Sequence, residues 1–124
     1  MPLAAFDHVN VRTTQLQEMT AWYEAILGLK SGPRPNFPFP GAWLYLQETA
    51  VVHLVDVDGA PQAGGDITLE HFAFAATDQA AFLSHLEAND VPYEVSEVAD
   101  YGITQINIHD PDGNHIHVDF RAAA

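Results

Sequence analysis

The stretch DPDGNHIHVDF, residues 110–120, decides the fold that we predict for this chain. Its first five residues are typical of a turn, because proline presets φ, glycine and asparagine accept positive φ, and aspartate caps its own backbone. The residues after the turn predict a strand, in which side chains alternate between two faces. The polar face holds His115, His117 and Asp119, and the other face is apolar. We therefore expect one face to pack and the other to carry chemistry.

Histidines recur along the chain at nearly one spacing. His53 lies in a second alternating segment, Val51–Val55, and precedes His117 by 64 residues. His8 and His71 are 63 residues apart, and each follows an acidic residue and precedes an alternating segment. Two independent pairs at nearly one offset indicate an internal duplication of about half the chain.

With these features the chain resembles the vicinal oxygen chelate superfamily, which includes glyoxalase I, fosfomycin-resistance, bleomycin-resistance and extradiol dioxygenase proteins. The features are a His-bearing first strand, a helix, a Leu-Gly-Leu turn at residues 27–29, and a last strand entered through DPDGN. The resemblance covers essentially the whole chain. It implies an α+β fold of two βαβββ modules, whose mixed β-sheets curl into a cup with the helices on the outer face.

The resemblance also implies a divalent metal ion, held by one residue from the first strand and one from the last strand of each module. By position these residues are His8, His53, His71 and His117. Imidazole is a common ligand of zinc, nickel and iron, so any of these ions would suit the set. In the glyoxalase and dioxygenase branches the last ligand is normally glutamate, and His117 departs from that pattern. No metal carboxylate is then left to act as a base, and the nearest inward acid, Asp119, becomes the candidate catalytic base.

Hydrophobic periodicity predicts the remaining elements. Strands are expected over residues 6–12, 42–47, 51–55, 69–75, 91–95, 102–109 and 115–120, with a short edge strand after Lys30 and helices over about 14–27 and 78–89. Thr14 and Gln17 have the spacing of a capping box, and Gly28 is the expected stop of the first helix. Leu44 and Leu46 should face that helix. The positions predicted to be buried are Val9, Val11, Leu44, Phe72, Phe74 and Ile116.

Polar and aromatic side chains are expected to line the cup and bind a small-molecule substrate. The candidates are Asn10, Arg12, Trp43, Tyr45 and Gln105. The alternative for Arg12 is a salt bridge at the rim, and the alternative for the aromatic residues and Gln105 is plain lining of a packed cavity. Phe37 and Phe39, in a proline-rich loop, could form a hydrophobic rim.

The length, cysteine content and net charge of the chain exclude several classes of fold, site and partner. A length of 124 residues predicts a single glyoxalase-like domain, residues 1–124, with module one at about 1–57, a linker at about 58–66 and module two at about 67–124. The absence of cysteine excludes disulfides and thiolate metal sites. A net charge of −13 disfavours nucleic acids and anionic membrane surfaces as partners. With no apolar run of roughly 18 residues and no signal peptide, a cytoplasmic protein is expected.

Three functions remain open. The first is a metal-dependent enzyme that chelates two vicinal oxygens of a small substrate, in the manner of glyoxalase-like isomerases and lyases. The second is an iron(II) extradiol-type dioxygenase. The third is a bleomycin-resistance-type binding protein without catalysis, which the acidic charge suits but which needs no inward histidines. A homodimer is expected, because the resemblance implies that in chains this short the two halves of a site often meet across a two-fold axis.

Overall fold

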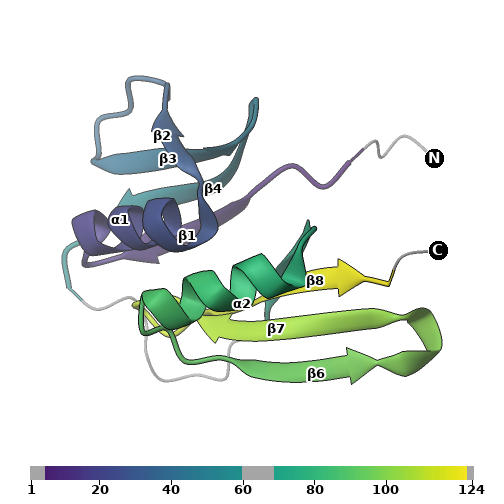
Figure 1. The fold of residues 1–124 in the computed structure, drawn as a ribbon. Coiled ribbons are helices and arrows are strands. Elements are labelled where there is room, and N and C mark those ends of the chain that lie inside the picture. Colours follow the sequence, from purple (N-terminus) through teal and green to yellow (C-terminus); the bar gives the residue numbers. More distant parts are fainter. Residues whose placement is uncertain (1–4, 60–68, 123–124) are drawn as a thin grey trace. The chain divides into compact units, whose positions relative to one another are not determined.

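The computed structural model describes residues 5–59 and 69–122, and it divides into two compact units, residues 1–65 and 66–124 (Figure 1). We call the described part of the first unit module one and that of the second module two, and treat each by itself. Both modules run in the order strand, helix and three further strands, which is the predicted βαβββ arrangement. Most of the predicted linker, residues 60–66, lies outside the described residues.

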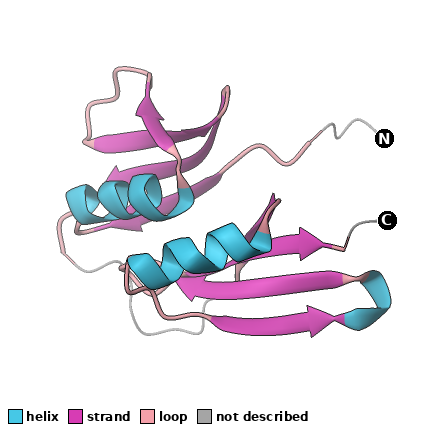
Figure 2. Cartoon of the chain, viewed as in Figure 1, coloured by secondary structure: helices cyan, strands magenta, loops and turns pink. Residues whose placement is uncertain are grey.

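Module one is a four-stranded mixed sheet with a helix on one face (Figure 2). Its elements are β1 (Val9–Thr13), α1 (Leu16–Leu27), β2 (Lys30–Gly32), β3 (Gly41–Leu46) and β4 (Thr49–Asp56). The strand order is β1-β4-β3-β2, with β1 parallel to β4 and the other pairs antiparallel. The core forms where α1 meets the sheet, and Met19, Tyr23, Leu44 and Val52 are completely buried there.

Module two repeats this topology. Its elements are β5 (Phe72–Ala76), α2 (Gln79–Ala88), β6 (Glu94–Val98), the short 3₁₀ helix η1 (Ala99–Tyr101), β7 (Ile103–His109) and β8 (His115–Arg121). The strand order is β5-β8-β7-β6, again with the first strand parallel to the last. Leu86, Ile106, Ile108 and Ile116 are completely buried. Two mixed sheets with two helices confirm the α+β fold.

Strand registers confirm the internal duplication. In module one Asn10 pairs with His53, and in module two Ala73 pairs with His117. The histidines of the two last strands therefore occupy the same place in the same topology. The repeated spacing in the sequence reflects a repeated position in space within each module.

The DPDGN turn forms as predicted and fixes the start of β8. The buried Asp110 carboxylate accepts hydrogen bonds from the backbone N–H groups of Asp112 at 3.0 Å and Asn114 at 2.9 Å. Gly113 has a φ of 87°, a conformation that disfavours residues with a Cβ. This turn determines which β8 side chains lie on each face of the sheet.

The predicted capping box at the first helix is wrong. The helix begins at Leu16, and its N-cap, Gln15, makes no side-chain capping hydrogen bond. Thr13 at the end of β1 instead accepts a hydrogen bond from the Gln15 backbone N–H at 3.0 Å. The predicted stop at Gly28 is confirmed, since Gly28 has a φ of 71° and its N–H donates to the Tyr23 carbonyl.

Two predictions of burial need correction. Leu46 is 45% exposed, because the register between β3 and β4 shifts between Leu44 and Tyr45 and ends the alternation before Leu46. Val9, Val11, Phe72 and Phe74 are half-buried rather than buried, whereas Leu44 and Ile116 are buried as predicted. The half-buried residues belong to β1 and β5, the edge strands of the two sheets. Among the described residues, neither α1 nor α2 has the length and hydropathy of a membrane span.

Candidate metal-binding histidine pairs

Each module brings its two predicted metal ligands together. In module one the rings of His8 and His53 stack with their centroids 3.8 Å apart and their planes at 10°. In module two the rings of His71 and His117 have centroids 4.1 Å apart and planes tilted by 43°. His53 and His117 are buried, and His8 and His71 are more exposed. We refer to these as the two histidine pairs.

Carboxylates hold three of the four imidazoles by Nδ1. The His8 Nδ1–H donates to Asp7 at 2.6 Å, and the His71 Nδ1–H donates to Glu70 at 2.6 Å. The His117 Nδ1–H donates to Asp119 at 2.5 Å. Because an ionised carboxylate can only accept, the proton lies on Nδ1 and the Nε2 lone pair is left for a cation.

His53 is held through its other ring nitrogen, Nε2. Its Nε2–H donates to the Ala50 carbonyl at 3.0 Å, which leaves Nδ1 as the atom with a lone pair. Burial holds the pKa of His53 below its ordinary value, and the neighbouring His8 lowers it further, although the bond to Ala50 and the charge of Asp7 act in the other direction. The buried imidazole is therefore favoured in the neutral form that binds a metal.

Glu70 bridges two imidazoles. Its second carboxylate oxygen accepts a hydrogen bond from His115 Nδ1 at 2.8 Å, so the same side chain holds His71 and His115. The bonds from His71 and then His115 lower the pKa of Glu70, which keeps the carboxylate ionised. The ligand atoms of Glu70, His71 and His115 lie within 4.8 Å of one another, close enough to hold a metal ion. The other nitrogen of His115 lies 2.9 Å from Asn107 Oδ1.

The sequence matches the family model of the Glyoxalase/Bleomycin resistance protein/Dioxygenase superfamily over residues 5–118. The chain belongs to this superfamily. No curated protein matches the sequence. Several solved structures share the fold of this superfamily member.

A glyoxylase/bleomycin resistance protein/dioxygenase domain from Frankia sp. EAN1pec has a TM-score of 0.80 at 19% identity, covering 98% of this chain and 95% of that one. A glyoxalase family protein from Bacillus anthracis has a TM-score of 0.79 at 19% identity, covering 97% of both chains. Lactoylglutathione lyase from Agrobacterium tumefaciens has a TM-score of 0.71 at 21% identity, covering 97% of this chain and 96% of the other. At these identities the likeness establishes the fold alone.

The predicted substrate residues have four different placements. Trp43 stacks on His53 with ring centroids 4.0 Å apart, so it lies on the face of the sheet that carries the first histidine pair. Tyr45 donates its hydroxyl to the Pro33 carbonyl at 2.5 Å, so this group supports the neighbouring loop. Gln105 accepts a hydrogen bond from Ser96 at 3.3 Å. The remaining two candidates, Asn10 and Arg12, are exposed on β1.

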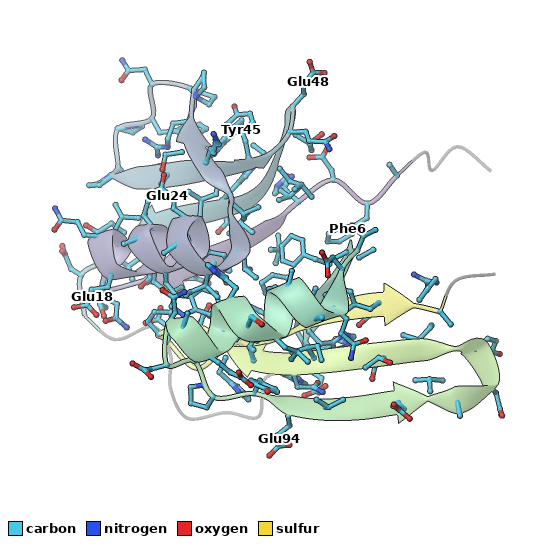
Figure 3. The ribbon with its side chains drawn as sticks, in the orientation of Figure 1. Phe6, Glu18, Glu24, Tyr45, Glu48 and Glu94 are labelled. Carbon is cyan, nitrogen blue, oxygen red and sulfur yellow. The ribbon has the colours of Figure 1, made fainter. Side chains whose placement is uncertain are left out.

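A hollow of about 560 Å³ lies beside the first histidine pair. Figure 3 shows two of its residues, Tyr45 on β3 and Glu48 at the tip of the turn between β3 and β4. A second hollow, of about 530 Å³, lies in module two beside His115 and Asn107. Both histidine-bearing faces therefore adjoin space for a small molecule.

Sequence reasoning missed the residues that orient the ligands. Asp7 and Glu70 were visible only as an acidic residue before each first-strand histidine, and no role followed from that pattern. Asp119 was predicted as a base, and the structure places it in a hydrogen bond to His117 with 19% of its side chain exposed. For Asp119 the signal was its position two residues from His117 on the same face of a strand, whereas Asp7 and Glu70 directly precede their histidines.

Proposed function

We propose that this chain is a metal-dependent vicinal oxygen chelate enzyme, a glyoxalase-like isomerase or lyase that acts on a small molecule with two neighbouring oxygens. One observation carries the proposal. Each of the four histidines has one ring nitrogen bound to an acceptor of its own module and the other nitrogen left for coordination. Metal-binding histidines in proteins almost always have such a partner, which fixes the tautomer and the orientation of the ring.

The donor set fits a divalent cation of intermediate softness. Four imidazoles and no thiolate suit zinc, nickel or iron(II), and we propose that His8, His53, His71 and His117 together hold one such ion. Held by neutral imidazoles alone, such an ion would keep its full positive charge and would polarise two vicinal oxygens of the substrate. The chain's own contribution is to keep all four rings in the ligating tautomer.

Proton transfer needs a base outside the ligand set. Asp119 lies on the same face of β8 as His117, and its Oδ1 atom accepts the His117 Nδ1–H. We propose that Oδ2 of the same carboxylate accepts the substrate proton. The same carboxylate would then both orient His117 and accept the proton.

A second candidate function is an iron(II) extradiol-type dioxygenase. The stacking of Trp43 on His53 favours it, since an aromatic wall beside the histidine pair suits an aromatic diol. Metal-free protein loaded with iron(II), nickel or zinc separates the two candidates. Oxygen uptake with a panel of catechols under iron identifies the dioxygenase, and isomerisation without oxygen uptake identifies the glyoxalase-like enzyme. Binding of bleomycin by metal-free protein, with neither activity, would overturn both.

Replacing Glu70 with glutamine tests the orienting carboxylates. An amide binds an N–H less strongly than a carboxylate and presents only one oxygen, so it cannot hold both His71 and His115 as Glu70 does. We expect the affinity for zinc to fall by about 10- to 100-fold, which is the usual effect of losing such a partner. Calorimetric titration of metal-free protein measures it. Glu94→Gln, at an exposed carboxylate on β6, is the control and should leave the affinity unchanged (Figure 3).

We further propose that the working unit is a homodimer in which module one of one chain and module two of its partner complete each site. Mixing metal-free His8→Ala and His117→Ala subunits tests this arrangement. In the heterodimer, one of the two sites regains all four histidines and the other loses two. We expect up to about half of the metal sites in the heterodimer to bind metal again. Confirmed subunit exchange without recovery of metal binding would exclude the shared site.

A further inference from the structure

The loop between β2 and β3 covers residues 33–40 (Figure 1). In this loop the guanidinium of Arg34 lies beside two stacked phenylalanine rings. The rings of Phe37 and Phe39 stack with centroids 5.0 Å apart and planes at 7°. The guanidinium carbon of Arg34 lies 5.1 Å from the first ring centroid and 5.5 Å from the second. The two phenylalanines are 38% and 40% exposed, unusually open for side chains of this size. We call these three residues the arginine–phenylalanine loop site.

Within the described part of the chain, Arg34 has no carboxylate partner. The chain has 17 acidic residues and 4 lysines and arginines, yet in residues 5–59 and 69–122 no ion pair joins Arg34 to an acid. Its Nη2–H donates to the Phe39 carbonyl at 3.0 Å, and its Nε–H is buried and faces no acceptor. A guanidinium has five N–H donors, so most of the donors of Arg34 are left for an acceptor from outside the chain.

Aromatic contacts connect the loop site to the first histidine pair. Phe37 lies 6.4 Å from Trp43, Trp43 lies 4.0 Å from His53, and His53 lies 3.8 Å from His8, all between ring centroids. These contacts place the loop on the histidine-bearing face of module one. A molecule on Phe37 would therefore lie on the face that leads to His53.

The loop is held in place before any ligand arrives. Tyr45 donates its hydroxyl to the Pro33 carbonyl, and a methyl group added at Gly32 would lie 2.8 Å from the Tyr45 ring. A methyl group added at Gly41 would clash with the Leu54 carbonyl oxygen and would lie 3.0 Å from Arg34 Nη2, so this glycine makes room for the neighbouring strand and for the guanidinium. The loop also contains four prolines, at positions 33, 35, 38 and 40, which restrict its backbone. A preformed site loses less entropy when it binds.

We propose that the arginine–phenylalanine loop site binds the aromatic carboxylate portion of the substrate. The planar ring packs on the exposed surface of the Phe37–Phe39 pair, and the carboxylate pairs with the guanidinium of Arg34. A planar fork of N–H donors matches a carboxylate through two parallel hydrogen bonds, and exposed phenyl faces select a ring over an aliphatic group. As a statement of substrate class the inference rests on the proposed function, but binding at the loop requires no metal.

Calorimetry on metal-free protein tests the site with three probes: benzoate, cyclohexanecarboxylate and benzamide. The first has both the ring and the charge, and each of the others lacks one. We expect benzoate to bind at least about tenfold more tightly than either of the others, since a charge-assisted hydrogen bond and a stacked ring each contribute about that factor. Equal binding of benzoate and cyclohexanecarboxylate, or no binding of benzoate, would overturn the proposal.

Two variants separate the contribution of the Arg34 charge to benzoate binding from that of the Phe37 ring. Arg34→Gln should weaken benzoate at least about tenfold and leave benzamide unchanged, and Phe37→Leu should remove the preference for benzoate over cyclohexanecarboxylate. Lys30→Gln removes one positive charge from exposed β2 and is the matched control, with less than about a threefold effect expected at physiological salt. A Lys30→Gln loss as large as that of Arg34→Gln would mean long-range attraction rather than a site, and would overturn the proposal.

If Arg34→Gln does not fold, Phe37→Leu and the three probes on the wild type still decide the question. The metal titration that tests the proposed function uses no aromatic acid, and the benzoate titration uses no metal. Failure of one therefore leaves the other result standing, and the two proposals are tested separately.

Discussion

Replacing His71 with alanine is expected to lower the affinity for zinc or nickel by more than about 100-fold, beyond the effect of losing a partner that only orients a ligand. The ring of His71 packs against His117 and is held by Glu70. Its loss would remove one of the four proposed ligands and leave Glu70 bound to His115 alone. The fold should persist, because His71 precedes β5 and is exposed. Calorimetric titration of metal-free protein measures the affinity, and circular dichroism checks the fold.

His85→Ala is the matched control for this substitution. His85 is an exposed histidine on α2, outside both histidine pairs, and its removal should leave the metal affinity unchanged. A His71→Ala protein that binds zinc as tightly as the wild type would contradict the ligand assignment. An equal loss in the two variants would show that the measured sites are general surface histidines.

Replacing Ile116 with alanine is expected to lower the free energy of unfolding by about 2–5 kcal/mol. Ile116 is completely buried on β8, between His115 and His117 in sequence and on the opposite face of the sheet. Its loss leaves a cavity in the core of module two while the histidine-bearing face keeps its residues. Urea unfolding of metal-free protein measures the change.

Val95→Ala is the control for this experiment. Val95 is 49% exposed on β6, and its truncation should change the free energy of unfolding by less than about 0.5 kcal/mol. A loss below about 1 kcal/mol at Ile116 would contradict the division of β8 into a packing face and a functional face. The same experiment therefore tests the alternation from which the fold was predicted.

The module arrangement could be predicted because its signals are local and repeated. Alternation of side chains predicts a strand face, and the same offset between two pairs of histidines predicts two copies of one topology. The wrong prediction that Leu46 faces the helix has a local cause that the residue types do not show. The register between β3 and β4 shifts between Leu44 and Tyr45, and nothing in the residue types there distinguishes this shift from continued alternation.

The candidate site could be predicted only in part. The four histidines followed from position, but the way in which each ring is held depends on side-chain geometry. His8 and His53 show the difference, since one is held through Nδ1 by the preceding residue and the other through Nε2 by the carbonyl of Ala50. Both are histidines on an inward face, and no pattern of residue types distinguishes these two arrangements.

The arginine–phenylalanine loop site could not be predicted from the sequence, for another reason. Residues 33–40 have no periodicity, and four prolines predict a loop without predicting which side chains meet. The phenylalanines were expected at a rim, whereas the contact of both rings with Arg34 depends on how the loop closes over Gly41. Loops of this kind carry specificity because the scaffold beneath them fixes their ends.

The metal content of protein purified without a histidine tag tests the central claim most directly, when it is combined with titration of the metal-free protein by zinc, nickel and iron(II). We predict one tightly bound ion per chain, whether the site lies within a chain or is shared by two, and loss of that ion when His8 or His71 becomes alanine. A protein that carries no metal as purified and binds none of the three ions would contradict it.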